Sequence, residues 1–268
     1  MDEPLATNSE PTANPPPAQG VLPLPVIQPK FCHTCGRPWQ PEWTDCPYCQ
    51  NAVPFRIETP EHERRSIRSA LLLYFVLLGC SAIAVIAISS GVEPIRAELG
   101  GEIGMAAVVV IWAAVQWRRI LPLLTHVPSI KWFGLALIGV ILTLGVAQGF
   151  VGLFNSLVHA RSIHMQDPFL QAGYGWGVVM LAIAVQPALI EELAFRGIIF
   201  SSLQEVLGPV ETIFVSAMMF MVLHLSPGMF PHTLAIGLAA GFLRWRTKSL
   251  YPAILLHFLH NSLVLALG

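Results

Sequence analysis

Long apolar runs constrain this chain of 268 residues more than any other feature, because a helix that crosses a bilayer needs about 20 largely apolar residues. The candidate runs are 69–89, 103–117, 132–157, 176–203, 212–225, 231–243 and 250–267. Only 12% of the residues are charged, whereas soluble domains carry about 25%. We therefore predict an all-α polytopic membrane protein with about seven transmembrane helices. Six or eight helices, and a very large soluble core, are the alternatives.

Lysine and arginine residues near the ends of these runs predict the orientation, because cytoplasmic loops of membrane proteins are enriched in both. If the N-terminus is cytoplasmic and the chain crosses the membrane seven times, nine basic residues fall on cytoplasmic flanks and two on the opposite side. The nine are Arg64, Arg65, Arg68, Arg118, Arg119, Lys131, Arg244, Arg246 and Lys248, and the two are Arg96 and Arg161. We therefore expect a cytoplasmic N-terminus.

The polar N-terminal part differs from the rest of the chain. Residues 1–29 contain eight prolines, each of which fixes φ and removes a backbone donor, so we expect a disordered tail. This stretch lacks the basic and apolar regions of a secretory signal. Residues 52–68 are expected to link the N-terminal part to a transmembrane domain at 69–268. A formal net charge of −1 excludes nucleic-acid binding by bulk electrostatics.

Four cysteines form two CxxC pairs within residues 30–51. Cys32 pairs with Cys35 and Cys46 with Cys49, so each pair can place two thiolates in one tight turn. Two such turns facing each other form a closed tetrahedral Cys₄ zinc site, which is structural. Because so short a module cannot build a core, the zinc would provide its folding energy. Two disulfides are the alternative, and they fit an oxidising compartment rather than a cytoplasmic segment.

The C-terminal third carries ionisable residues inside apolar runs, where lipid tolerates them only with partners. Glu191, Glu192 and Arg196 lie in one run. On a helix Glu192 and Arg196 share a face, whereas Glu191 points about 100° away, so one carboxylate can pair with the arginine while the other stays free. Pro187, one turn earlier, is expected to kink this helix. A buried Glu–Arg pair that only joins two helices is the alternative interpretation.

Two further apolar helices bring histidine and asparagine side chains. His224 follows Phe220 by four residues, and His257 and Asn261 are four apart on the last helix, with His260 between them. Each of these residues alone is typical of hydrogen-bonded packing. Desolvated polar groups must nevertheless find partners or bind a ligand. Together they predict a site for a water molecule, a metal ion or both, and no serine or cysteine nucleophile lies in a comparable setting.

These residues also resemble a known family. The segment EELAFR at 191–196 matches an EExxxR motif, FMVLH at 220–224 an FxxxH motif, and HFLHN at 257–261 an HxxxN motif. The three motifs, in this order, resemble those of the CPBP family of CAAX prenyl proteases and bacteriocin-processing enzymes, also called ABI-domain intramembrane proteases. The resemblance covers about residues 130–268 and does not extend to the predicted zinc ribbon, which resembles short ribbons at the N-termini of bacterial membrane proteins.

The resemblance implies a role for each matching residue. Glu191 would activate the hydrolytic water, Glu192 would support it, and Arg196 would hold the acidic pair. His224 would orient or deprotonate the water. On the last helix, His257 and Asn261 would polarise the scissile carbonyl and stabilise the oxyanion. The family is classed as metalloproteases, so a catalytic metal at Glu191, His224 and His257 is left open, since two histidines and a glutamate are a ligand set for catalytic zinc.

The sequence thus predicts an intramembrane endopeptidase in a bacterial inner membrane, acting on a peptide or membrane-protein substrate within the lipid bilayer. The alternative is a non-enzymatic scaffold or a bacteriocin self-immunity protein, which would use the zinc ribbon to bind a protein partner. A small-ion transporter is a third interpretation, although the chain shows no paired broken helices in matching halves.

Overall fold

The computed structural model describes residues 30–31, 37–39, 60–158 and 164–267. Near the N-terminus, strand β1 (Lys30–Phe31) pairs antiparallel with strand β2 (Pro38–Trp39), and Lys30 lies opposite Trp39. The tail 1–29 and all four CxxC cysteines, Cys32, Cys35, Cys46 and Cys49, lie outside the described residues. The zinc ribbon therefore stays a prediction.

The rest of the described chain is mainly helical, and each predicted apolar run corresponds to a helix or to a continuous helical segment. These are α1 (Pro60–Ser89), α2 (Pro94–Val115), α4 (Ile130–Val158), the segment Trp176–Leu203, α9 (Pro209–Leu223), α10 (Phe230–Thr247) and α11 (Tyr251–Leu267). Four of them are long and apolar enough to cross a membrane, whereas α9, with 15 residues, spans only about 22 Å. The protein is an all-α polytopic membrane protein.

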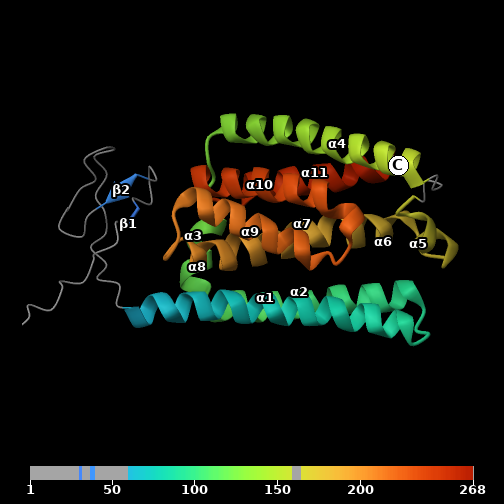
Figure 1. The fold of residues 1–268 in the computed structure, drawn as a ribbon, viewed down its shortest axis with the longest axis horizontal. Coiled ribbons are helices and arrows are strands. Elements are labelled where there is room, and N and C mark those ends of the chain that lie inside the picture. The colour runs from blue at the N-terminus through green and yellow to red at the C-terminus, as the bar shows by residue number, and fades with distance from the viewer. Residues whose placement is uncertain (1–29, 32–36, 40–59, 159–163, 268) are drawn as a thin grey trace, which may run out of the picture.

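The helices form three layers (Figure 1). The α1–α2 hairpin is one outer layer and α4 is the other, with the segment 176–203 and α9, α10 and α11 between them. Burial follows this order. In the most apolar stretch of the segment 176–203, 44% of the residues are buried inside the protein, whereas in that of α2 only 6% are buried. The motif residues thus lie on the elements that lipid reaches least.

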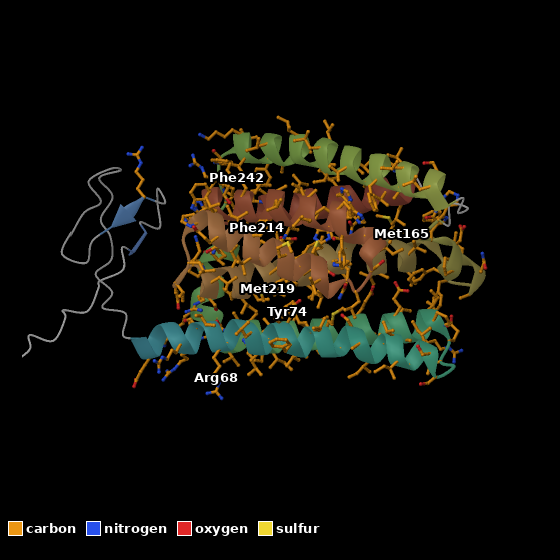
Figure 2. The ribbon with its side chains drawn as sticks, in the orientation of Figure 1. Arg68, Tyr74, Met165, Phe214, Met219 and Phe242 are labelled. Carbon is orange, nitrogen blue, oxygen red and sulfur yellow. The ribbon has the colours of Figure 1, made fainter. Side chains whose placement is uncertain are left out.

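Outward faces of the outer layers are apolar, as expected for contact with lipid. On α1, Phe75, Ile83 and Ile86 are each more than 60% exposed, and soluble proteins rarely leave so large an apolar surface uncovered. Figure 2 shows Arg68 pointing away from the bundle and Tyr74 pointing toward the central layer. Tyr74 is 8% exposed, so α1 separates a lipid face from a protein face.

Helix α2 begins at Pro94, not near residue 103 as the apolar run predicts. The carboxylate of Glu93 caps it by accepting hydrogen bonds from the backbone N–H groups of Ile95 (3.0 Å) and Arg96 (2.8 Å). Pro94 fits the first helical position because the N–H that it lacks would have no intrahelical partner. Two polar turns are therefore added to the N-terminal end of this helix.

A short helix, α3 (Trp117–Thr125), follows α2 and was not predicted as a separate element. The C-terminal layer holds it in place, because the Leu250 N–H donates to the carbonyl of Leu123 (3.3 Å) and the Tyr251 hydroxyl donates to that of Leu124 (2.6 Å). Two smaller helices, α5 (Asp167–Gln171) and η3 (Pro227–Met229), complete the connections.

Candidate active site

The EExxxR residues lie on a helical segment in which the α-helical hydrogen-bond pattern is twice interrupted by a π-helical turn. This segment comprises α6 (Trp176–Met180), η1 (Leu181–Val185), α7 (Gln186–Glu192), η2 (Leu193–Ile199) and α8 (Phe200–Leu203), in which η1 and η2 are π-helical. The Gln186 N–H donates to the carbonyl of Leu181, five residues back, immediately before Pro187. The irregularity predicted at Pro187 is thus a π-helical turn, a feature frequent at functional sites.

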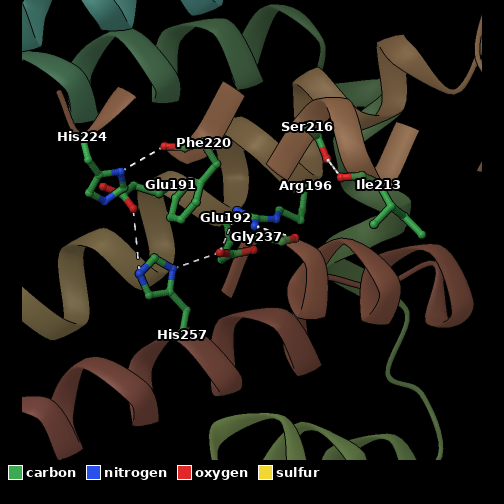
Figure 3. A network of polar contacts seen from close by, with 9 residues as sticks. All are labelled: Glu191, Glu192, Arg196, Ile213, Ser216, Phe220, His224, Gly237 and His257. Atoms are coloured by element: carbon green, nitrogen blue, oxygen red, sulfur yellow. Dashed lines mark hydrogen bonds and ion pairs between the residues drawn. The ribbon is translucent and has the colours of Figure 1, made fainter. Parts of the chain in front are cut away.

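Glu192 and Arg196 form a fully buried ion pair, as their spacing predicts. The Arg196 guanidinium donates to Glu192 Oε1 at 3.1 Å and, with its other terminal nitrogen, to the carbonyl of Gly237 on α10 at 3.1 Å (Figure 3). Both side chains are 0% exposed. Because a charge so deeply buried needs a paired and hydrogen-bonded partner, this network fixes the motif segment against α10.

His257 on α11 lies between the two glutamates. Its Nδ1–H donates to Glu192 Oε1 at 2.9 Å, and its Nε2 faces Glu191 Oε2 at 3.8 Å (Figure 3). The Glu191 side chain is 18% exposed and makes no ion pair with arginine or lysine among the described residues. The two adjacent carboxylates therefore differ: Glu192 is held by Arg196 and His257, whereas Glu191 is available to a ligand.

His224 ends α9 and presents one nitrogen to the site. Its Nδ1 lies 3.0 Å from the carbonyl of Phe220, which can only accept, so Nδ1 carries the proton and Nε2 of the neutral ring has a free lone pair. The Phe220 ring packs edge-on against His224 at 4.9 Å and against His257 at 5.8 Å. The phenylalanine of the FxxxH motif thus holds both imidazoles in position.

A cavity of about 260 Å³ lies next to these groups, and we call it the central cavity. Its polar lining includes Glu191, His224, His257 and Asn261. Asn261 lies on the same face of α11 as His257, and its amide donates to the carbonyl of Ile183 in the π-helical segment η1 at 2.8 Å. Since one water occupies about 30 Å³, this cavity can hold a water molecule together with part of a ligand.

Comparison with protein families gives a match over this region. Residues 174–263 match the model of the Rce1-like family, described as type II CAAX prenyl endopeptidase Rce1-like. This part of the chain, about a third of its length, is therefore similar to that family. No curated protein and no solved structure matches the chain.

The CAAX endopeptidase-like segment contains all six site residues predicted from the sequence: Glu191, Glu192, Arg196, His224, His257 and Asn261. The structure brings them together around the central cavity and its supporting ion pair. The matched range is narrower than the residues 130–268 over which the sequence resemblance extends, and it leaves α1, α2 and α4 outside.

The geometry gives no support to the metal predicted as an alternative at Glu191, His224 and His257. In the described part of the chain, no three His, Cys, Asp or Glu side chains lie close enough together to hold a metal ion. The donor types suit zinc, but His257 Nε2 and Glu191 Oε2, which lie 3.8 Å apart, have no third such donor close enough among the described residues to complete a site. We therefore derive no catalytic step through a metal.

Sequence reasoning missed several residues that lie beside the six predicted site residues. Gly237 accepts a hydrogen bond from Arg196, and a Cβ at Gly237 would lie 2.9 Å from that of Ala217 on α9, so only glycine permits this approach. Glu98 and Glu102 of α2 also line the central cavity. Their spacing of one helical turn is a visible signal, but the apolar run at 103–117 begins after them.

Proposed function

We propose that this protein is an intramembrane endopeptidase in which Glu191 activates a water molecule to hydrolyse a peptide bond. The observation that carries this proposal is the asymmetry of the glutamate pair. Glu192 is fully buried and bound to Arg196 and His257, whereas Glu191 faces a cavity shared with His224. A free carboxylate beside an imidazole lone pair, in a cavity lined by protein, supports general-base chemistry.

The reaction begins with a water molecule between Glu191 and His224. One of its protons passes to the Glu191 carboxylate while the other donates to His224 Nε2, which is an acceptor because Nδ1 is occupied by the carbonyl of Phe220. The oxygen attacks the scissile carbonyl carbon and forms a tetrahedral intermediate. The C–N bond then breaks, Glu191 returns its proton to the leaving nitrogen, and a carboxylic acid and an amine are released.

The developing oxyanion needs donors, and α11 supplies them. In its imidazolium form, His257 would keep its Nδ1–H on Glu192 and offer its Nε2–H to the oxyanion. Asn261 has a second amide N–H besides the one bound to the carbonyl of Ile183. Such prearranged donors lower the barrier because they need no reorganisation during the reaction.

The experiment is cleavage of a panel of membrane-spanning peptides by the purified full chain in nanodiscs, with products identified by mass spectrometry. We expect the wild type to cut at least one peptide and Glu191→Ala and His224→Ala to lose most of that activity. Glu211→Gln is the matched control, because Glu211 is an exposed carboxylate in the first turn of α9. Equal inactivity of the wild type and both variants on the whole panel would contradict the proposal.

We further propose that the protein lies in a bacterial inner membrane with its N-terminus in the cytoplasm. Arg64, Arg65 and Arg68 lie in the first turns of α1, at the same end of the bundle as α3, which carries Arg118 and Arg119 (Figure 1). This clustering supports the orientation. Labelling of single cysteines introduced at the two membrane faces, with a membrane-impermeant maleimide, tests it.

We also propose that the N-terminal ribbon binds one structural zinc through Cys32, Cys35, Cys46 and Cys49. The same ribbon is proposed to bind a protein partner. The double CxxC spacing supports the zinc site. Metal analysis of the purified protein tests it: one zinc per chain is expected, and none after all four cysteines are changed to serine.

A further inference from the structure

Two carboxylates outside the family segment face the candidate active site. Glu98 and Glu102 lie one turn apart on α2, and both line the central cavity together with Glu191. They also line an adjacent cavity of about 340 Å³, which extends to the C-terminal turns of α1. Glu98 is exposed and Glu102 is half-buried.

The position of this pair is fixed by the motif segment itself. The side-chain amide of Gln186, in the first turn of α7, donates to the backbone carbonyl of Glu102 at 3.2 Å. This hydrogen bond ties α2 to the helix that carries Glu191. Glu98 and Glu102 are therefore held beside the reacting groups rather than lying there by an incidental approach of a lipid-facing helix.

No lysine, arginine or histidine of the described chain forms an ion pair with Glu98 or Glu102. With Glu191, three carboxylates thus line connected space in a membrane protein without a cation between them. Like charges placed together in surroundings of low dielectric repel strongly. A positively charged ligand would remove this repulsion.

An independent observation in the same cavity also indicates a hydrogen-bond donor as the ligand. The Thr143 hydroxyl donates to the carbonyl of Val140 (3.1 Å), so it accepts from His260 Nδ1 (2.9 Å). His260 Nε2 is then an acceptor, and this nitrogen is buried without a partner in a side chain that is 1% exposed and lines the central cavity. A buried acceptor left unpaired is costly.

Most of the free groups that we identify in this space, three carboxylates and the Nε2 lone pairs of His224 and His260, are acceptors, whereas Asn261 keeps one free amide N–H. Their ligand should therefore be positively charged and rich in N–H donors. A guanidinium or ammonium group at the end of a flexible chain meets both conditions and can reach acceptors that are spread along a cavity. A bare metal ion needs donors that converge on one point, which the described side chains do not provide.

We propose that Glu98 and Glu102 form a subsite that binds a basic side chain of the peptide substrate close to the scissile bond. This inference rests on the proposed endopeptidase function and adds a preference for lysine or arginine near the cut. The two glutamates act as specificity-determining residues, whereas Glu191 performs the chemistry.

The test uses the full chain in nanodiscs and a membrane peptide that it cuts, resynthesised with arginine or its neutral isostere citrulline at each position flanking the cut. We expect kcat/KM to be at least about tenfold higher for arginine at one of these positions, as for a partly desolvated charged hydrogen bond of about 1.4 kcal/mol. In Glu98→Gln/Glu102→Gln, this ratio should fall to about one while cleavage of the citrulline peptide is retained.

Glu211→Gln removes one exposed carboxylate away from the cavity and should keep the wild-type ratio. Retained cleavage of the citrulline peptide separates loss of the subsite from loss of the fold. An arginine-to-citrulline ratio near one in the wild type, or a ratio that the double variant leaves unchanged, would overturn the inference while the endopeptidase function stands.

A wild type that cuts no peptide would refute the endopeptidase function. In that case, the binding of peptides to the wild type and to the double variant tests the subsite on its own. Fluorescence anisotropy of the arginine and citrulline peptides with the wild type is the measurement. Tighter binding of the arginine peptide that disappears in Glu98→Gln/Glu102→Gln supports the subsite. Equal binding of both peptides, or binding of neither, refutes it.

Discussion

Replacing Arg196 by methionine should destabilise the protein by about 3–5 kcal/mol, the typical cost of removing one partner of a buried ion pair. The guanidinium makes two hydrogen bonds of 3.1 Å, to Glu192 and to the carbonyl of Gly237, and both members of the ion pair are 0% exposed. Methionine fills similar space but leaves the Glu192 charge with His257 alone and the Gly237 carbonyl without its donor. At about 1.4 kcal/mol per factor of ten, the folded-to-unfolded ratio falls by two to three and a half orders of magnitude.

A double-mutant cycle with Glu192→Gln separates the pair from other effects of each substitution. The double variant has no uncompensated buried carboxylate, so its loss should be smaller than the sum of the single losses, with a coupling of about 1–3 kcal/mol. Equilibrium unfolding in mixed micelles, followed by tryptophan fluorescence, measures all four proteins. A loss below about 1 kcal/mol for Arg196→Met, or additive single losses, would refute the argument that this buried pair fixes the motif segment.

Two further predictions concern packing and metal. Gly237→Ala should destabilise the protein by about 1–3 kcal/mol, because the added Cβ would lie 2.9 Å from that of Ala217. The control Gly145→Ala, whose added Cβ would meet no atom within 4 Å, should be neutral or stabilising. Thermal unfolding in detergent measures both variants, and equal melting temperatures would contradict the expectation. A peptide of residues 30–50 should fold only with zinc, so identical circular dichroism with and without the metal would refute the zinc ribbon.

Local spacing predicted the features that depend on a single helix. The four-residue interval predicts the Glu192–Arg196 pair, and the same interval places His257 and Asn261 on one face of α11, as the structure shows. Apolar runs likewise predicted the helical membrane architecture. These features follow from helix geometry and burial alone, and no knowledge of neighbouring elements is needed.

Features that depend on contacts between elements were not predictable from such patterns. The cap by Glu93 extends α2 beyond the apolar run, and only the packing of α2 against the motif segment brings Glu98 and Glu102 to the cavity. The π-helical turns around α7 likewise have no simple signature in hydropathy.

Arg244 shows the same limit for a charged residue. The sequence placed it on a cytoplasmic flank, but its side chain is 3% exposed. Its guanidinium donates to the carbonyl of Arg196 at 2.9 Å and to the Ser201 hydroxyl at 3.2 Å. Arg244 therefore supports the motif segment from α10, and it should not be counted among the charges that set the orientation.

The central claim is that Glu191 is free to act on water because Glu192 is held by the buried network. It is tested most directly by measuring kcat and the free energy of unfolding together for Glu191→Gln. Loss of a general base lowers kcat by about 10²–10⁴-fold, and removing a carboxylate that pairs with no arginine or lysine of the described chain should leave stability within about 0.5 kcal/mol of the wild type. A variant that keeps wild-type kcat, or one that loses activity only because it unfolds, would contradict the account.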